Sequence, residues 1–97
     1  MIQIHETFIC KPGNASKLAK LMKEFMSEFD ETVSIMTDVT GQFNKVVIVS
    51  QHESLTAYEE SWKKYEQDTE KMKKMEEAFK GYTEMYLTGS REIYRVW

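Results

Sequence analysis

The sequence predicts an α+β fold of the ferredoxin-like type, with the element order βαββαβ, in one domain over residues 1–97. Two stretches repeat apolar residues at spacings of three and four, as amphipathic helices do. Other stretches alternate apolar and polar residues like strands, and residues 46–49 are apolar at every position. This order predicts an antiparallel four-stranded sheet, strand order 4-1-3-2, with the helices on one face.

Residues 2–10 form the first predicted strand, and Lys11-Pro12-Gly13-Asn14 ends it. Three apolar residues of this strand share one face: Ile4, Phe8 and Cys10. Three residues lie on the opposite face: His5, Thr7 and Ile9. Asn14 or Ser16 caps the helix that follows. Its apolar stripe comprises Leu18, Leu21, Met22, Phe25, Met26 and Phe29.

The middle of the chain predicts a hairpin. Residues 32–39 are rich in β-branched side chains, Thr40-Gly41 is a plausible turn, and residues 43–51 contain the fully apolar run. Because two helices cover only one face of a small sheet, the other apolar face of this third strand requires a partner. A second copy of the chain, paired sheet against sheet, is the simplest one.

Ser54 caps the second predicted helix, whose stripe comprises Leu55, Tyr58, Trp62, Tyr65, Met72, Met75 and Phe79. The stripe turns polar near residues 67–69, which predicts a kink or a break into two helices. Gly81 ends the helix. Residues 82–97 form a final strand with a bulge at Gly89-Ser90.

Composition narrows the classes of partner. The net charge is -3 and no basic stripe is present, so we expect no nucleic-acid binding. No apolar stretch reaches the roughly 20 residues that span a bilayer, and residues 1–6 do not resemble a signal peptide. The lone Cys10 allows no internal disulfide and fits a reducing compartment, so we expect a cytoplasmic protein without membrane contact.

Three segments carry a resemblance to the dimeric α+β barrel superfamily, specifically to its small NIPSNAP-like and antibiotic-biosynthesis-monooxygenase-like domains. They are Lys11-Pro12-Gly13, Phe43-Asn44-Lys45-Val46-Val47 and His52-Glu53-Ser54-Leu55. The resemblance covers nearly the whole chain and implies a homodimer that pairs through its sheets. It also implies a pocket between sheet and helices, in which relatives bind small organic molecules or haem.

The resemblance does not extend to haem degradation. Haem-degrading members use an Asn on the first strand together with a Trp and a His. Here the first strand has no Asn, and Trp62 is followed by no His. We therefore expect no cofactor. The cofactor-free monooxygenases of the group use Trp, Tyr and Asn, which do not align one by one with this chain.

His5 and His52, the only histidines, are the candidate catalytic residues. The antiparallel pairing of the first and third strands brings them to the same end of the sheet. Either imidazole could take a proton from a phenol or enol substrate. The alternative is a strand-face histidine and a loop histidine without catalytic roles. No metal site is expected, because no pair of ligands has zinc-site spacing.

Tyr58, Trp62 and Tyr65 share one face of the second helix and, with His5, are the candidate ligand-binding residues. The alternative is that these aromatic side chains belong to the core. In the final strand, Arg91 shares a face with Arg95 and could clamp a carboxylate, or simply face solvent.

The leading functional hypothesis is a homodimer that binds a small hydrophobic or aromatic molecule between sheet and helices. One alternative is a cofactor-independent monooxygenase acting on an aromatic or polyketide-like substrate. The other is a structural or regulatory dimer without an open pocket. The sequence predicts neither the identity of the ligand nor the face of the sheet that His5 occupies.

Overall fold

The computed structural model describes residues 1–97 and confirms the predicted α+β architecture. The four strands are β1 (Ile2–Cys10), β2 (Thr32–Thr37), β3 (Lys45–His52) and β4 (Tyr86–Arg95). The helices are α1 (Ala15–Met26), α2 (Leu55–Glu66) and α3 (Thr69–Ala78), with a single 3₁₀ turn, η1 (Tyr82–Glu84). The sheet is antiparallel with the order β2-β3-β1-β4, which is the predicted 4-1-3-2 order from the other edge.

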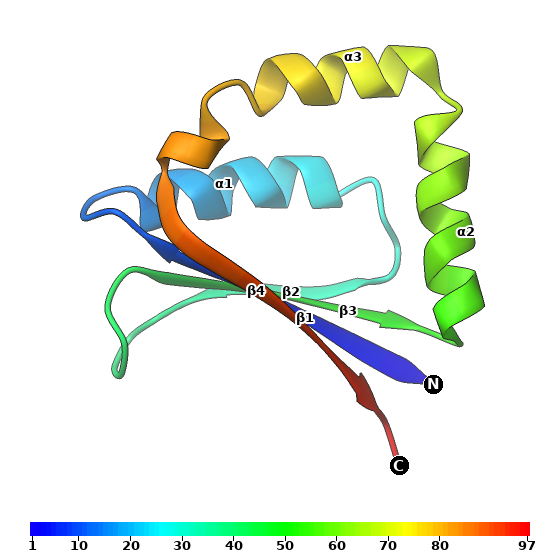
Figure 1. Ribbon diagram of the computed structural model, residues 1–97, viewed down its shortest axis with the longest axis horizontal. Coiled ribbons are helices and arrows are strands. Elements are labelled where there is room, and N and C mark those ends of the chain that lie inside the picture. The colour runs from blue at the N-terminus through cyan, green and yellow to red at the C-terminus, as the bar shows by residue number, and fades with distance from the viewer.

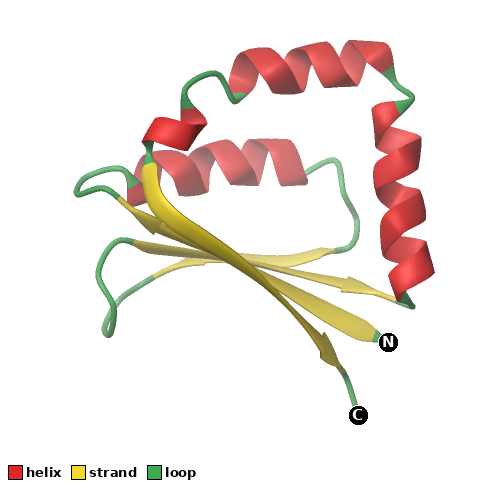
Figure 2. Cartoon of the chain, viewed as in Figure 1, coloured by secondary structure: helices red, strands yellow, loops and turns green.

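All helices lie on one side of the sheet (Figure 1). Helix α1 runs along the sheet, α2 rises from the end of β3, and α3 returns over α1 toward β4 (Figure 2). The predicted break between the second and third helices is confirmed. It lies at Asp68, whose carboxylate accepts a hydrogen bond from the backbone N–H of Lys71 at 3.1 Å and so starts α3.

The core lies between α1 and the inner face of the sheet, defined here as the face that carries the helices. Its most completely buried residues are Ile4, Cys10, Leu18 and Val46. In β1, Ile4 and Cys10 belong to the predicted apolar face, and the cross-strand partner of Phe8 is the buried Val46. Alternation therefore assigned this strand's faces correctly.

Several element boundaries differ from the prediction; β2, for example, ends at Thr37 rather than at residue 39. Strand β3 begins at Lys45 rather than Phe43, because Asn44 has a left-handed backbone (φ 61°) that cannot continue a strand. Helix α1 ends at Met26, so Phe29 packs from the following loop. Strand β4 begins at Tyr86, after η1.

The bulge in β4 is displaced from its predicted position. The register with β1 shifts between Ile9 and Cys10, which makes Leu87 the extra residue. Gly89 instead pairs directly with Phe8, and a Cβ atom at position 89 would lie 3.3 Å from the Phe8 ring. Gly89 is thus explained by a close approach of strand and ring.

Candidate functional site

A cleft lies between the inner face of the sheet, α1 and the returning α3. Its volume is about 340 Å³, and nine of its eleven lining residues are apolar or aromatic. The sheet contributes Glu6, Phe8 and Ile48. The helical segments contribute Met22, Phe25, Met26, Trp62, Met75, Glu76, Phe79 and Tyr82. This size and lining are typical of sites for small organic molecules.

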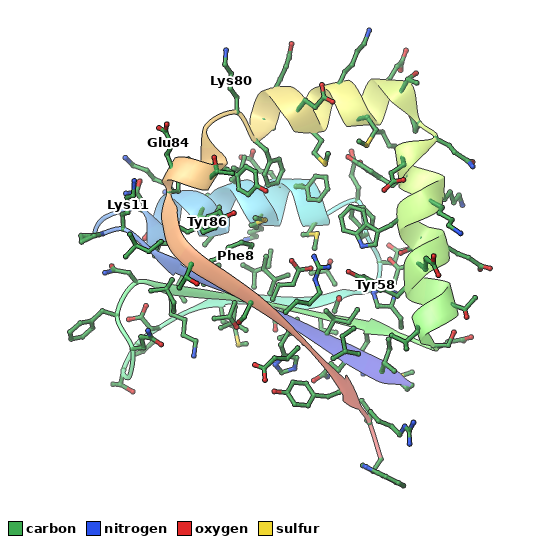
Figure 3. All side chains as sticks on the ribbon, in the orientation of Figure 1. Phe8, Lys11, Tyr58, Lys80, Glu84 and Tyr86 are labelled. Atoms are coloured by element: carbon green, nitrogen blue, oxygen red, sulfur yellow. The ribbon has the colours of Figure 1, made fainter.

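Aromatic packing forms the helical side of the cleft. The Phe25 ring lies at the centre, with centroid distances of 5.0 Å to Phe79, 5.5 Å to Tyr65 and 6.4 Å to Trp62. Phe8 stacks edge-to-face on Tyr86 at 4.9 Å on the sheet side (Figure 3). Such pairs hold the rings in defined orientations and so give the cleft a fixed shape.

Glu6 is the charged residue that the sheet contributes to the cleft. It lies on the same face of β1 as the buried Ile4, and its side chain is 19% exposed. The Oε2 atom is 3.3 Å from Nη2 of Arg91, its direct cross-strand partner on β4. Of the two alternatives for Arg91, binding a carboxylate or facing solvent, the structure shows both in part: one contact to Glu6 of its own chain and a side chain that is 52% exposed.

A second, small cavity adjoins the cleft, and the two share Glu6, Met26 and Trp62. Its volume is about 20 Å³, which is room for a single water molecule. Its polar lining comprises Glu6, Glu31, Thr32, Ser50, His52, Tyr58 and Ser61. The cleft therefore has one polar end, on the side of α2.

His52 lies at this polar end. It is the only buried polar or charged residue of the chain, and its ring packs edge-to-face on Tyr58 at 5.0 Å. Burial lowers the pKa of His52, and the negative charge of Glu31 opposes part of that shift. The imidazole is therefore neutral at pH 7, which is the form that can accept a proton.

His5 does not join this site. It pairs with Val49 across the sheet and lies on the outer face, defined here as the face without helices. Its Nε2 atom forms a hydrogen bond with Oε1 of Gln3 at 2.8 Å, and its ring packs on that of Tyr94 with the centroids 5.0 Å apart. The two histidines were expected at the same end of the sheet, but His52 pairs with Ile2 at the end of β1 whereas His5 pairs with Val49 three residues further along. They also occupy opposite faces, because residue 5 alternates with the inner-facing Ile4 and Glu6.

The three aromatic candidates on α2 occupy three different places. Trp62 lines both the cleft and the small cavity, whereas Tyr58 lines the small cavity alone and points inward from α2 (Figure 3). Tyr65 is buried in the aromatic packing, and its hydroxyl donates to the carbonyl oxygen of Lys71 at 3.4 Å. Burial is also the main reason that the pKa of the Tyr65 hydroxyl is raised.

Sequence reasoning missed two contributions to the site. Glu6 was detectable, since it is a charged residue on the inner alternation of a central strand. Phe79, directly after α3, belongs to the predicted apolar stripe but was not assigned to the site, and Tyr82 of η1 carried no comparable signal. The pKa of the Tyr82 hydroxyl is raised by burial, by its neighbour Tyr86 and by the negative charge of Glu6, in decreasing order of effect.

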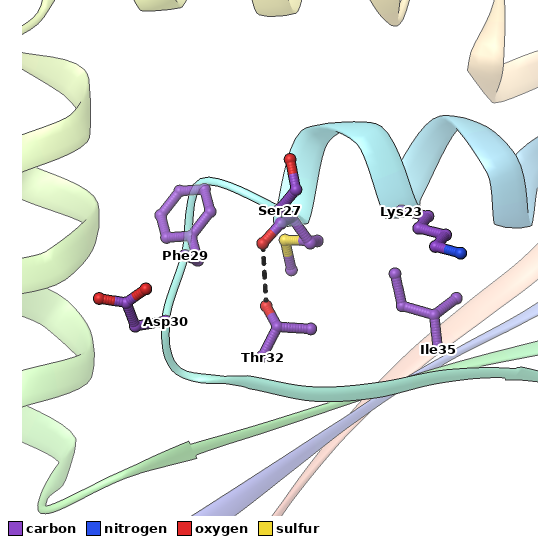
Figure 4. A pocket seen from close by; sticks show the side chains of 7 residues that line it. Lys23, Ser27, Phe29, Asp30, Thr32 and Ile35 are labelled. Atoms are coloured by element: carbon purple, nitrogen blue, oxygen red, sulfur yellow. Dashed lines mark hydrogen bonds between the residues drawn. The ribbon is translucent and has the colours of Figure 1, made fainter.

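A larger hollow, of about 440 Å³, lies between the end of α1 and β2 (Figure 4). Three of its seven lining residues are exposed polar side chains, Lys23, Ser27 and Asp30. Within it, the Thr32 hydroxyl donates to the carbonyl oxygen of Met26 at 3.5 Å. No charged group is sheltered there, so the cleft is the better candidate site.

The geometry does not support a metal site, a reactive cysteine or a membrane-spanning helix. No three of the His, Cys, Asp and Glu side chains converge as metal ligands. Cys10 is buried, and burial raises the pKa of its thiol, which disfavours the reactive thiolate. None of the helices has the length and apolar character needed to cross a bilayer.

Solved structures share this fold. An uncharacterised NIPSNAP domain protein from Burkholderia xenovorans superposes with a TM-score of 0.81 at 10% identity, over 100% of this chain and 95% of its own. A NIPSNAP family protein of unknown function from Agrobacterium tumefaciens gives a TM-score of 0.75 at 16% identity, over 97% and 86% of the two chains.

A third structure, from Deinococcus radiodurans, carries the name of the antibiotic biosynthesis monooxygenases. Its TM-score is 0.61 at 14% identity, over 100% of this chain and 93% of its own. No family model and no curated protein matches the sequence. These similarities concern the fold, and they confirm the resemblance noted in the sequence at that level. The chain therefore has the fold of the NIPSNAP domain proteins and of the monooxygenase-named protein.

Proposed function

We propose that this chain forms a homodimer that binds a small apolar or aromatic molecule in the cleft between sheet and helices. The observation that carries the proposal is the cleft itself, with nine apolar or aromatic residues among eleven and a volume of about 340 Å³. The side chains of Phe25, Trp62 and Phe79 are only partly buried, and an apolar ligand in the cleft would remove their remaining exposed surface from water. The lone cysteine fits a cytoplasmic location for this dimer.

The test is a thermal-shift screen with flavins, haem, phenols, quinones and aromatic acids on the wild type and on Trp62→Ala. A ligand present at a hundred times its Kd adds about 2.7 kcal/mol to the free energy of unfolding. We expect a stabilising ligand whose effect disappears in Trp62→Ala. Leu55→Ala is the matched control, because Leu55 is an exposed residue of α2 outside the cleft.

Two results would contradict the proposal. If no compound of the panel raises the melting temperature, a structural or regulatory dimer without a ligand would be favoured. A stabilising effect that survives in Trp62→Ala, with that variant still folded by circular dichroism, would place the ligand elsewhere on the molecule.

The dimer is proposed to form through the outer face of the sheet. That face carries apolar side chains of β3 and β2, of which Val49 is buried within its own chain and Met36 is 47% exposed. Tyr94 of β4 is 46% exposed on the same face. Trp97 does not pack on its own sheet and is fully exposed. These side chains would gain burial from a second copy.

A second candidate function, cofactor-independent oxygenation of an aromatic or polyketide-like compound, is favoured by the neutral His52 at the polar end of the cleft. His52 would deprotonate the substrate before it reacts with oxygen. Oxygen consumption by the wild type, lost in a folded His52→Ala and retained in His5→Ala, would support it. Binding without oxygen consumption would leave the protein a binding domain.

A further inference from the structure

Glu6 is a costly residue for its position. Glu6 lies on the inner face of a central strand with its side chain 19% exposed, so its carboxylate loses much of its hydration, and glutamate is seldom buried without partners. Its one polar partner is Arg91, at 3.3 Å through Oε2. The Arg91 side chain is 52% exposed, so solvent screens much of that attraction. The pairing therefore offsets only part of the cost of placing a carboxylate here.

The second carboxylate oxygen, Oε1, takes no part in the ion pair with Arg91 and is not sealed from solvent, and the side chain lines both the cleft and the small cavity. We propose that Glu6 anchors the ligand, and that the cleft selects neutral aromatic molecules carrying one hydroxyl group. The hydroxyl would donate to Oε1 while the ring fills the apolar part of the cleft. This inference rests on the proposed function and adds to it the chemical class of the ligand.

Charge around Glu6 explains the preference for a neutral donor. An anionic ligand would face the carboxylate of Glu6 directly, so a negatively charged oxygen is disfavoured nearby. A cationic ligand would compete with Arg91, which is already paired with Oε2. A neutral hydroxyl meets neither obstacle, and a hydrogen bond to an ionised acceptor is stronger than one between neutral groups.

Isothermal titration with three probes of one shape tests the inference: 2-naphthol, 2-methoxynaphthalene, which lacks the donor, and 2-naphthoate, which is an anion. We expect the wild type to bind 2-naphthol about tenfold more tightly than 2-methoxynaphthalene. The preference should disappear in Glu6→Leu and persist in Glu76→Leu. Glu76 is the matched control, since it lines the same cleft but is exposed.

The outcomes separate the two proposals. Equal binding of 2-naphthol and 2-methoxynaphthalene by the wild type would overturn the role of Glu6 while supporting the ligand cleft. Tighter binding of 2-naphthoate would make Arg91 the anchor and also overturn it. No binding of any probe would overturn both proposals. If Glu6→Leu does not fold, Glu6→Gln, which keeps the size of the side chain and removes its charge, replaces it, and an undiminished preference in Glu6→Gln would overturn the role of the carboxylate.

Discussion

The two faces of the sheet differ in what their histidines can do. On the inner face, His52 is buried beside Tyr58 at the polar end of the cleft. On the outer face, His5 is half-buried and bonds Gln3, two residues away in its own strand. The inner face removes polar side chains from water, and burial of this kind can shift the pKa of a side chain. The outer face offers a broad surface, and the hollow on it that Thr7 and Glu92 line does not include His5.

This difference divides the expected roles of the molecule between the faces. We assign ligand binding to the inner face, because the cleft, Glu6 and His52 lie there. We assign self-association to the outer face, because its apolar side chains have no helix to cover them (Figure 1). The predictions below test the division, beginning with the largest effect.

Leu18→Ala tests the packing of the inner face. Leu18 is completely buried between α1 and the sheet, so its truncation leaves a cavity and should lower the free energy of unfolding by about 3 kcal/mol. Met36→Ala, on the half-exposed outer face, should cost less than about 1 kcal/mol in dilute protein. Urea denaturation of both variants measures the contrast. Equal costs would contradict the distinction between the faces.

Val47→Glu tests the outer face. Val47 lies there between Thr7 and Met36, and a carboxylate at this position would be buried without a partner in a sheet-to-sheet dimer. We expect the Kd of the dimer to rise roughly a hundredfold, about 2.7 kcal/mol, as measured by analytical ultracentrifugation. Thr56→Glu adds the same charge on the exposed surface of α2 and should leave the Kd unchanged. A monomeric wild type would refute the dimer.

Local patterns sufficed for the fold. Alternation in β1 predicted which residues face the helices, and the polar stretch near Asp68 predicted where the helix breaks. The helical wall of the cleft could not be predicted in the same way. Phe79 reaches Phe25 only because α3 turns back over α1, and the angle of that turn depends on tertiary packing rather than on local sequence.

For single residues too, some placements could be predicted from local patterns and others depended on tertiary packing. Glu6 could have been assigned to the site from its alternation with Ile4 and Phe8. Tyr65 shares a helical face with Trp62, yet it is buried in the packing around Phe25 because the α2–α3 corner closes over it. The extra residue in β4 was also beyond local reasoning, since Gly89 resembles a bulge residue but serves a close contact with Phe8.

The final prediction concerns the pH dependence that the inner face imposes through His52. Because burial disfavours its imidazolium form, the pKa of His52 in the folded protein lies below the ordinary value of 6.5. Between these two pKa values the unfolded chain binds more protons than the folded one, so the free energy of unfolding falls as the pH is lowered through about 6.5. The loss is complete once the pH is below the folded pKa. His52→Gln removes this contribution and should give a flatter stability curve between pH 8 and 5 in urea titrations.

A second variant shows whether the environment of the inner face causes this effect. The charge of Glu31 favours the imidazolium and so limits the shift. Glu31→Gln should therefore lower the folded pKa of His52 further and steepen the loss of stability in acid, in the opposite direction to His52→Gln. Parallel stability curves for the wild type and His52→Gln would mean that the inner face does not perturb this histidine. His52 would then no longer be a candidate for the buried base of the cleft. Glu6 would be the one proposed determinant of ligand selection.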